Sequence, residues 1–421
     1  MTARAARFPL FDSLRALAAL SVLGFHAVYT SRLIVSGFHA PGLDRYVAHL
    51  DVGVTIFFLI SGFLLYRPFA RARLEGEPMP SAGAYAWRRL LRIVPAYWLA
   101  LTVLGIWLSF PGLFQFHNAI RYYGFAQIYR GDTSLGGIGQ AWTLCVEATF
   151  YVMLPVYALA LRRLSARSPR RWLVTELGGL AALVVVSEAY KIWAVTRVGD
   201  PNSLNAAPYL MPLPNFLDDF AIGMGLAVAG LAVETGELRG RAVEWLRRRP
   251  SAPWLVAAAA FVVAGLTIGP PGFGGASRAK DEILARHGLY ALVALGVVLP
   301  AVTASARPRG AARRVLALRP LLWVGLVSYG VYLWHLGVEG KVIRWTGLPR
   351  GVIASFGEVA LITAASLLAA GLSYYLVERP ILSLKNRWPG RPRGPPDQPG
   401  AVSAPAAPPA ADQASAGLPS G

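Results

Sequence analysis

Ten long apolar runs dominate this chain, and each is close to the length needed to cross a lipid bilayer as a helix. A bilayer core offers no water to satisfy backbone N–H and C=O groups, so such runs are expected to be helical. They do not alternate polar and apolar residues, which argues against membrane strands. The expected spans are residues 10–30, 50–66, 92–110, 141–161, 173–196, 213–233, 252–269, 284–305, 320–338 and 353–376.

The composition agrees with a membrane protein, because only 15% of the residues are charged, against about 25% in soluble domains. The first run contains Arg15 and lacks a convincing small-residue cleavage site, so we interpret it as a retained helix. The predicted fold is an all-α integral membrane bundle of about ten helices over residues 1–388. Residues 389–421 are rich in Pro, Ala, Gly and Ser and are expected to form a disordered cytoplasmic tail, with no soluble catalytic domain.

Lysine and arginine are distributed unequally between the loops. With the N-terminus placed inside, the inside segments hold 28 of the 41 basic residues and the outside loops hold 10. Positive loops resist translocation, so both termini are predicted to be cytoplasmic. The same bias explains the net charge of +19 without a nucleic-acid partner.

Ionisable side chains inside the predicted helices are costly there, which makes each a candidate for function. Arg15 and His26 lie eleven residues apart on the first helix. They therefore share a face and are separated by about 16 Å along the axis, with His26 nearer the outer surface. Asp12, one turn before Arg15, is placed to pair with it.

Three other helices bring polar groups to about the depth of His26, within roughly 10 Å of the outer surface. A carboxylate or imidazole beside a histidine fixes its tautomer and supports proton abstraction. The alternatives are an interfacial histidine, a structural carboxylate pair, and aspartates that reach the surface. The residues at this depth are Glu147, Asp218, Asp219 and His335. Asp219 is favoured over Asp218 as a substrate contact. Cys145, one turn from Glu147, is expected to be buried and inert.

The segment 67–92 ends in WRRLLR, which places Arg89 and Arg92 one turn apart at a helix start. Positive side chains at a helix N-terminus favour phosphate binding. Ordinary anchoring of the helix on the cytoplasmic side explains the same residues without a ligand. The residues alone leave both interpretations open.

Six segments, taken in order, resemble those of the acyltransferase 3 family of ten-helix membrane O-acyltransferases, which includes bacterial polysaccharide O-acetylases and macrolide acyltransferases. Together they cover about residues 10–381, and six in order make a specific signal where one would be weak. The sequence departs from the family pattern at Thr55, Ala148 and Gly337. The segments are FDSLRALAALSVLGFHA with Arg15 and His26, DVGVTIFFLISGFLLYRPF with Ser61, Gly62 and Phe63, RRLLRIVPAYW with Arg89 and Arg92, AWTLCVEATFYVMLP with Trp142 and Glu147, SYGVYLWHLGV with Ser328, Tyr329, Tyr332 and His335, and YYLVERP with Glu378 and Pro380.

The resemblance implies transfer of an acyl group, acetyl by default, from cytosolic acyl-coenzyme A to a sugar hydroxyl, in a bacterial cytoplasmic membrane and without a metal. The acceptor classes left open are a cell-envelope glycan, a glycolipid and a glycosylated metabolite. His26 would act as general base, with Glu147 or His335 orienting it. The coenzyme phosphates would bind Arg15, Arg88, Arg89 and Arg92, and the substrate contacts would be Ser61, Trp142, Asp219 and Tyr329.

A proton-coupled transporter of a small molecule is the main alternative. Ten helices with buried ionisable residues also suit such a carrier, and without the six segments it would rank first. A carrier would neither acylate an acceptor nor hydrolyse acetyl-coenzyme A, which separates the two hypotheses. A non-catalytic scaffold would leave the polar groups of matched depth unexplained.

Overall fold

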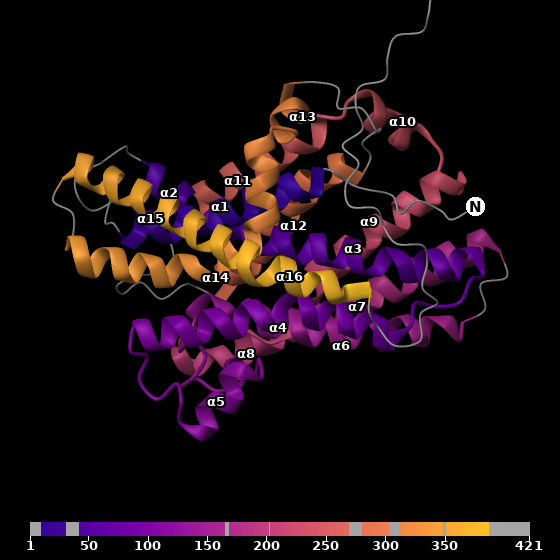
Figure 1. Ribbon diagram of the computed structural model, residues 1–421. Coiled ribbons are helices and arrows are strands. Elements are labelled where there is room, and N and C mark those ends of the chain that lie inside the picture. The colour runs from indigo at the N-terminus through magenta and orange to yellow at the C-terminus, as the bar shows by residue number, and fades with distance from the viewer. Residues whose placement is uncertain are drawn as a thin grey trace, which may run out of the picture.

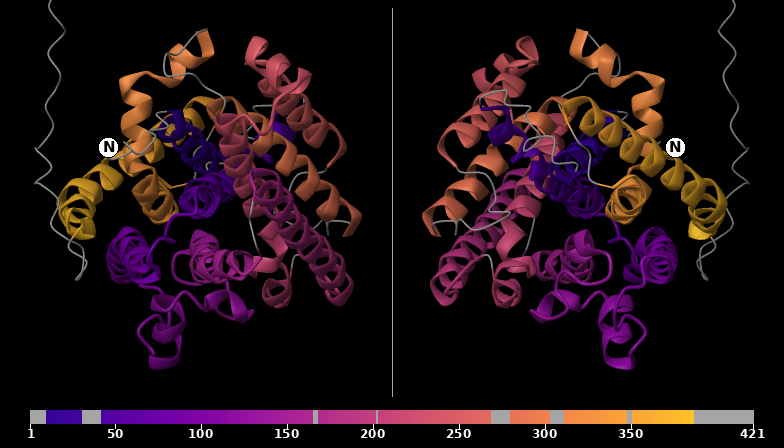
Figure 2. Two further views of the ribbon diagram at one scale, coloured as in Figure 1. Left: turned by 90° about the vertical axis from the view of Figure 1, so that its right-hand side faces the viewer. Right: turned by 90° about the vertical axis from the view of Figure 1, so that its left-hand side faces the viewer.

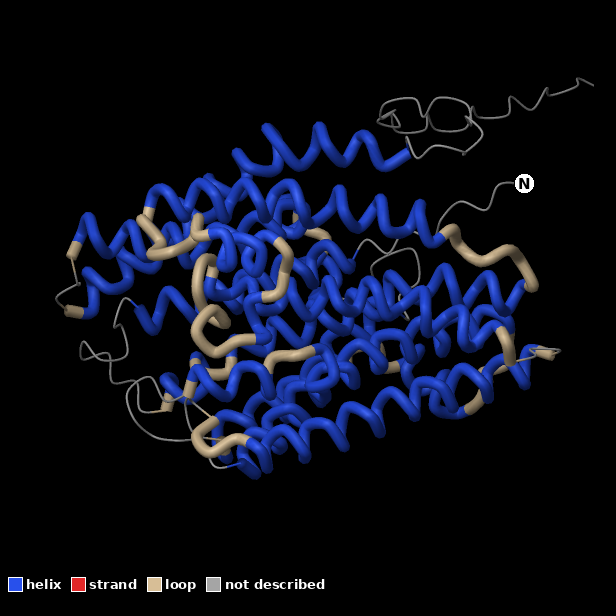
Figure 3. The backbone as a smooth tube through the Cα atoms, turned by 90° about the horizontal axis from the view of Figure 1, so that it is seen from below, coloured by secondary structure: helices blue, strands red, loops and turns tan. Residues whose placement is uncertain are grey.

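The computed structural model describes residues 10–30, 42–164, 168–201, 203–268, 280–302, 311–347 and 351–386. Within these ranges every regular element is helical (Figure 3). The long helices lie side by side along one common direction, which crosses the view in Figure 1 and is closer to end-on in Figure 2. The predicted tail, residues 389–421, lies outside the described residues, as do both chain termini.

Nine helical segments of the described chain are long and apolar enough to cross a membrane, and the pair α10 and α11, bent by 86°, counts as a tenth if it forms one span. The predicted all-α, roughly ten-helix membrane bundle is thereby confirmed. The long helices are α1 (Leu10–Thr30), α3 (Gly53–Glu75), α4 (Ala82–Trp107), α6 (Trp142–Arg162), α7 (Pro169–Arg197), α9 (Leu217–Thr235), α11 (Ala252–Thr267), α12 (Lys280–Val302), α14 (Arg319–Thr346) and α15 (Val352–Ser373). The shorter ones are α2 (Leu43–Val47), α5 (Phe116–Tyr123), α8 (Ala207–Leu210), α10 (Arg241–Arg248), α13 (Ala311–Leu316) and α16 (Arg379–Leu382).

Several helices continue beyond the predicted spans. The span predicted to end at residue 66 runs to Glu75, and α4 starts ten residues before its predicted span. Hydropathy marks only the lipid-covered part of a helix, whereas ion pairs hold the charged turns beyond it. The pairs that join α3 to other helices are Arg67 with Glu234 at 2.6 Å, Arg71 with Glu234 at 2.8 Å and Arg73 with Glu176 at 2.7 Å. We call this end of the bundle, where α3 ends and α4 begins, the arginine end, and the other the distal end.

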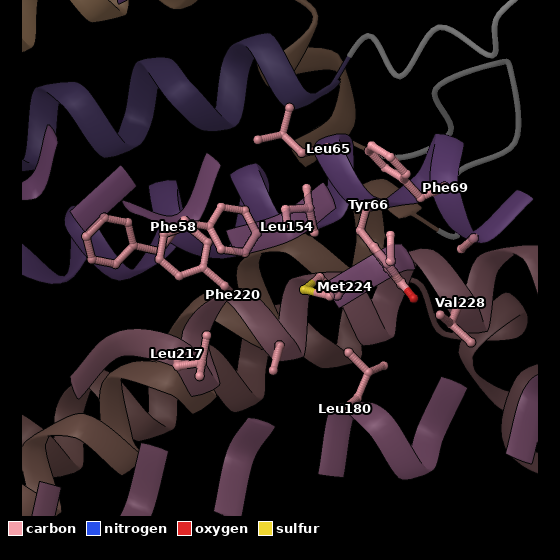
Figure 4. Packing of buried hydrophobic residues seen from close by; sticks show 14 of the residues in the cluster. Phe58, Leu65, Tyr66, Phe69, Leu154, Leu180, Leu217, Phe220, Met224 and Val228 are labelled. Atoms are coloured by element: carbon pink, nitrogen blue, oxygen red, sulfur yellow. The ribbon is translucent and has the colours of Figure 1, made fainter. Parts of the chain in front are cut away.

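The centre of the bundle is built around α3 and α9. Phe58 of α3 stacks on Phe220 of α9, with ring centroids 4.8 Å apart (Figure 4). The two backbones approach closely at glycines, as is common between membrane helices. A Cβ added at Gly62 would lie 2.2 Å from the carbonyl oxygen of Phe220, and one added at Gly223 would lie 2.0 Å from that of Leu59. This contact fixes the position of Gly62 and of its neighbour Ser61, which belongs to the candidate site.

Alanine at Gly223 is expected to destabilise the protein by about 1–3 kcal/mol, because its methyl group must displace backbone and not a flexible side chain. The matched control is Gly225→Ala on the same helix, where the nearest atom to an added Cβ is 3.8 Å away. Melting of the purified protein in detergent should show a lower Tm for G223A and an unchanged or higher Tm for G225A. Equal Tm values for the two variants would contradict the close contact.

Candidate active site

A cavity of about 100 Å³ lies between α1, α3, α4, α6 and α14. This volume is enough for several water molecules. Its wall combines cations, one carboxylate, hydroxyls and aromatic rings. Six of the residues predicted for the site line it, namely Arg15, Ser61, Arg89, Arg92, Glu147 and Tyr329.

Both carboxylate oxygens of Glu147 accept hydrogen bonds from hydroxyl groups. Ser61 of α3 donates to Oε1 at 2.9 Å, and Tyr151 of α6 donates to Oε2 at 2.9 Å. Glu147 is thus held on the cavity wall by two hydroxyls. The sequence-based reasoning missed Tyr151, although its spacing of four residues from Glu147 on one helix was a usable signal.

Three arginines converge on the cavity from two helices. Arg15 pairs with Asp12 at 3.2 Å, which confirms that predicted pair. The guanidinium carbon of Arg89 lies 5.9 Å from the centroid of the Tyr151 ring, and its buried Nε has no hydrogen-bond partner within the described chain. The cavity wall carries these three positive groups against the single carboxylate of Glu147, so a further anion would be attracted there. An unpaired buried donor among them therefore fits a phosphate-bearing ligand.

Arg92 and Tyr329 meet on the same wall of the cavity. The guanidinium carbon of Arg92 lies 5.9 Å from the Tyr329 ring centroid, and the Tyr329 hydroxyl donates to the carbonyl oxygen of Ile93 at 2.8 Å. Arg88, the fourth predicted phosphate ligand, is not among the lining residues. One residue corresponds to about 100° of rotation on a helix, so Arg88 and Arg89 point in different directions.

His26 and His335 are in contact, with His335 Nε2 3.2 Å from His26 Nδ1. His26 Nδ1 also lies 2.9 Å from the Val22 carbonyl oxygen, and His335 Nδ1 lies 2.9 Å from that of Tyr332. A nitrogen that faces a carbonyl oxygen must carry the proton, so both neutral rings are protonated at Nδ1. His335 Nε2 then accepts from His26 Nδ1–H, which leaves His26 Nε2 with a free lone pair.

Tyr332 lies between the cavity and His335, and it belongs to a hydrogen-bonded group with Gln140 and Thr143 that we call the tyrosine partition. Tyr332 lines the cavity on one side, and its ring centroid lies 5.8 Å from that of His335 on the other. Its hydroxyl donates to the Gln140 carbonyl oxygen at 2.9 Å and lies 2.7 Å from that of Thr143. The Gln140 side chain donates to the Tyr332 carbonyl oxygen at 2.9 Å. Neither His26 nor His335 is among the residues that line the cavity.

Two predicted substrate contacts lie elsewhere. The Trp142 ring packs on Phe216, with centroids 5.3 Å apart. Asp219 is buried on α9 next to Asp218, which forms an ion pair with Lys191 of α7 at 2.6 Å. Neither Trp142 nor Asp219 lines the cavity. In the part of the chain that the structure describes, no three His, Cys, Asp or Glu side chains are grouped so as to hold a metal ion.

A family model described as an acyltransferase domain matches residues 9–377 of the chain. The chain belongs to the acyltransferase 3 family. The family match thus includes His26 and His335, all four predicted arginines and Glu147.

Two relatives of this acyltransferase 3 chain differ in how much of their own length the chain covers. The peptidoglycan O-acetyltransferase OatA of Listeria monocytogenes is 23% identical over 404 residues, which is 89% of this chain and 55% of OatA. Nodulation protein 10 of Rhizobium leguminosarum bv. viciae is 27% identical over 403 residues, with 89% of this chain and 93% of the relative covered. The chain thus spans about half of the first protein and most of the second. No solved structure matches the chain significantly.

Proposed function

We propose that this protein is a membrane O-acyltransferase. It would transfer an acyl group, acetyl by default, from acyl-coenzyme A to a hydroxyl of a carbohydrate-type acceptor in a bacterial cytoplasmic membrane. The acceptor classes are a cell-envelope glycan, a glycolipid and a glycosylated metabolite. The observation that carries the proposal is the contact between His26 and His335, whose ring centroid lies 5.8 Å from that of Tyr332 in the wall of the arginine-lined cavity.

The donor would enter at the arginine end, which the distribution of basic loops assigns to the cytoplasm together with both termini. Arg15, Arg89 and Arg92 would hold the phosphates of the coenzyme, since guanidinium groups bind phosphate oxygens in pairs. The axial distance of about 16 Å from Arg15 to His26 is comparable to the length of a pantetheine arm. The acyl thioester would then reach the tyrosine partition, where the Tyr332 side chain would have to move aside for the thioester carbonyl group to meet His26.

His26 Nε2 would remove the proton of the acceptor hydroxyl while that oxygen attacks the thioester carbonyl carbon. The new C–O bond forms, the C–S bond breaks, and the coenzyme leaves as a thiol with the proton that His26 returns. His335 would accept the Nδ1–H bond throughout and so hold the ring and stabilise its cationic form. General-base assistance of this kind typically contributes about 10²- to 10⁴-fold in rate.

The proposal is tested with purified full-length protein in lipid nanodiscs and acetyl-coenzyme A labelled in the acetyl group. We expect free coenzyme thiol to appear, and label to enter glycan, lipid or metabolite fractions of a bacterial extract. Mass spectrometry of the same fractions from a deletion strain should identify the acceptor as a species that has lost its acetyl group. Protein that releases no thiol and transfers no label, but moves a solute in proteoliposomes, would be a transporter.

A further inference from the structure

A second concave site lies on the outside of the bundle, away from the proposed catalytic groups. It is a groove of about 620 Å³ between α4 and α15, with α14 as its floor. This volume falls within the range of about 300–1,000 Å³ that is usual for ligand sites. We propose that this groove binds one bilayer phospholipid, with an acyl chain along the groove and an anionic headgroup at Lys341.

The shape of the groove follows from helical periodicity. Trp334, Val338 and Trp345 recur at intervals that place them on one face of α14, and they line the groove over about 16 Å. On α15 the lining residues Ala365, Ala369 and Leu372 also share one face, and their small members widen the space beside α14. The result is an apolar channel of acyl-chain proportions in the lipid-facing surface.

The charge lies at one end of the channel. Lys341 Nζ is 5.1 Å from the ring centroid of Trp107, the last residue of α4, and 5.6 Å from that of Trp345. The two indoles lie edge to face with centroids 6.1 Å apart. Tryptophan is enriched at membrane–water interfaces, so this end of the groove lies at headgroup depth of the leaflet at the distal end.

The positive charge of Lys341 favours a lipid with an anionic headgroup as the occupant of the groove. Lys341 forms no ion pair with any carboxylate of the described residues, and cation–aromatic contacts leave its N–H donors available. A lipid phosphate at this position would receive those donors, while its chain would replace bulk lipid in the groove. A net negative headgroup adds long-range attraction that a zwitterionic one lacks. The site is therefore expected to prefer phosphatidylglycerol to phosphatidylcholine with the same chains.

Native mass spectrometry of the purified full-length protein, titrated with each of these lipids, tests the proposal. The wild type should retain phosphatidylglycerol in preference. Lys341→Ala should weaken that retention by about fivefold, and Ala369→Trp, which fills the channel, should reduce retention of both lipids. The controls are Arg197→Ala, which removes a comparable cation over Trp193 at the distal end of α7, and Ala182→Trp on an exposed position of α7.

Both controls should retain lipid as the wild type does. Retention that is equal in the wild type, K341A and A369W would overturn the site, and so would loss of the preference in R197A to the same extent as in K341A. Co-purification of a polyprenyl phosphate in the groove would overturn the assignment to a bilayer phospholipid. The readout does not depend on catalysis, so it stands or fails separately from the proposed acyl transfer.

Discussion

Alanine at His26 is expected to reduce acetyl transfer by at least about 10²-fold and to leave the amount of folded protein unchanged. The side chain is only half-buried, and its ring contacts His335 and the Val22 carbonyl group, so removing it takes away the proposed base without opening a large core cavity. The measurement is the rate of thiol release from acetyl-coenzyme A in the presence of acceptor, together with the Tm.

Two further histidine variants sharpen this test. His335→Ala should lower the rate less than His26→Ala does, because His26 keeps its hydrogen bond to Val22 and loses only the second acceptor for Nδ1–H. His117→Ala, on the exposed face of α5, is the matched control and should have wild-type activity. Full activity of H26A would remove His26 from the mechanism.

The second large effect is expected at the arginines of the cavity. Replacing both Arg89 and Arg92 with alanine should raise the KM for the acyl donor by about tenfold or more for each lost charged hydrogen bond, with a smaller effect on kcat. Steady-state kinetics with varied acetyl-coenzyme A measures both constants. The double lysine variant should recover part of the affinity, since it restores charge without the paired donors of arginine.

Arg88→Ala is the matched control for this prediction. It neighbours Arg89 in sequence but does not line the cavity, so its KM for the donor should stay close to that of the wild type. An unchanged KM in the Arg89 and Arg92 double variant would favour simple anchoring of α4. A KM increase of equal size in R88A would point to loss of general positive charge.

The sequence predicted the helices well because the cost of unsatisfied backbone in lipid acts on each segment separately. Helix ends were predicted less well. The last turns of α3 depend on Glu176 and Glu234, which lie more than a hundred residues away in sequence and carry no local signal. Pairing of this kind is decided by the packed bundle, not by the hydropathy of either segment.

In the candidate site, too, features set by a single helix were predicted better than contacts between helices. The rise per residue of a helix gives depth, and depth correctly suggested that His26 and His335 could meet. Depth says nothing about which way a helix is turned within the bundle. Glu147 has a similar depth but lies on the cavity wall with Ser61, and Asp219 lies on α9 away from the cavity. Assigning those residues required knowing which helices are neighbours.

The tyrosine partition has a consequence for the energetics of the cell. A bacterial membrane stores a proton gradient, and a water-filled path from one face to the other would discharge it. Tyr332 lies between the cavity and His335, it is hydrogen-bonded to Thr143 and Gln140, and all three residues are buried. Under the proposed function, a bundle closed in this way would admit the acyl donor from one compartment and serve an acceptor in the other while the membrane remained electrically sealed.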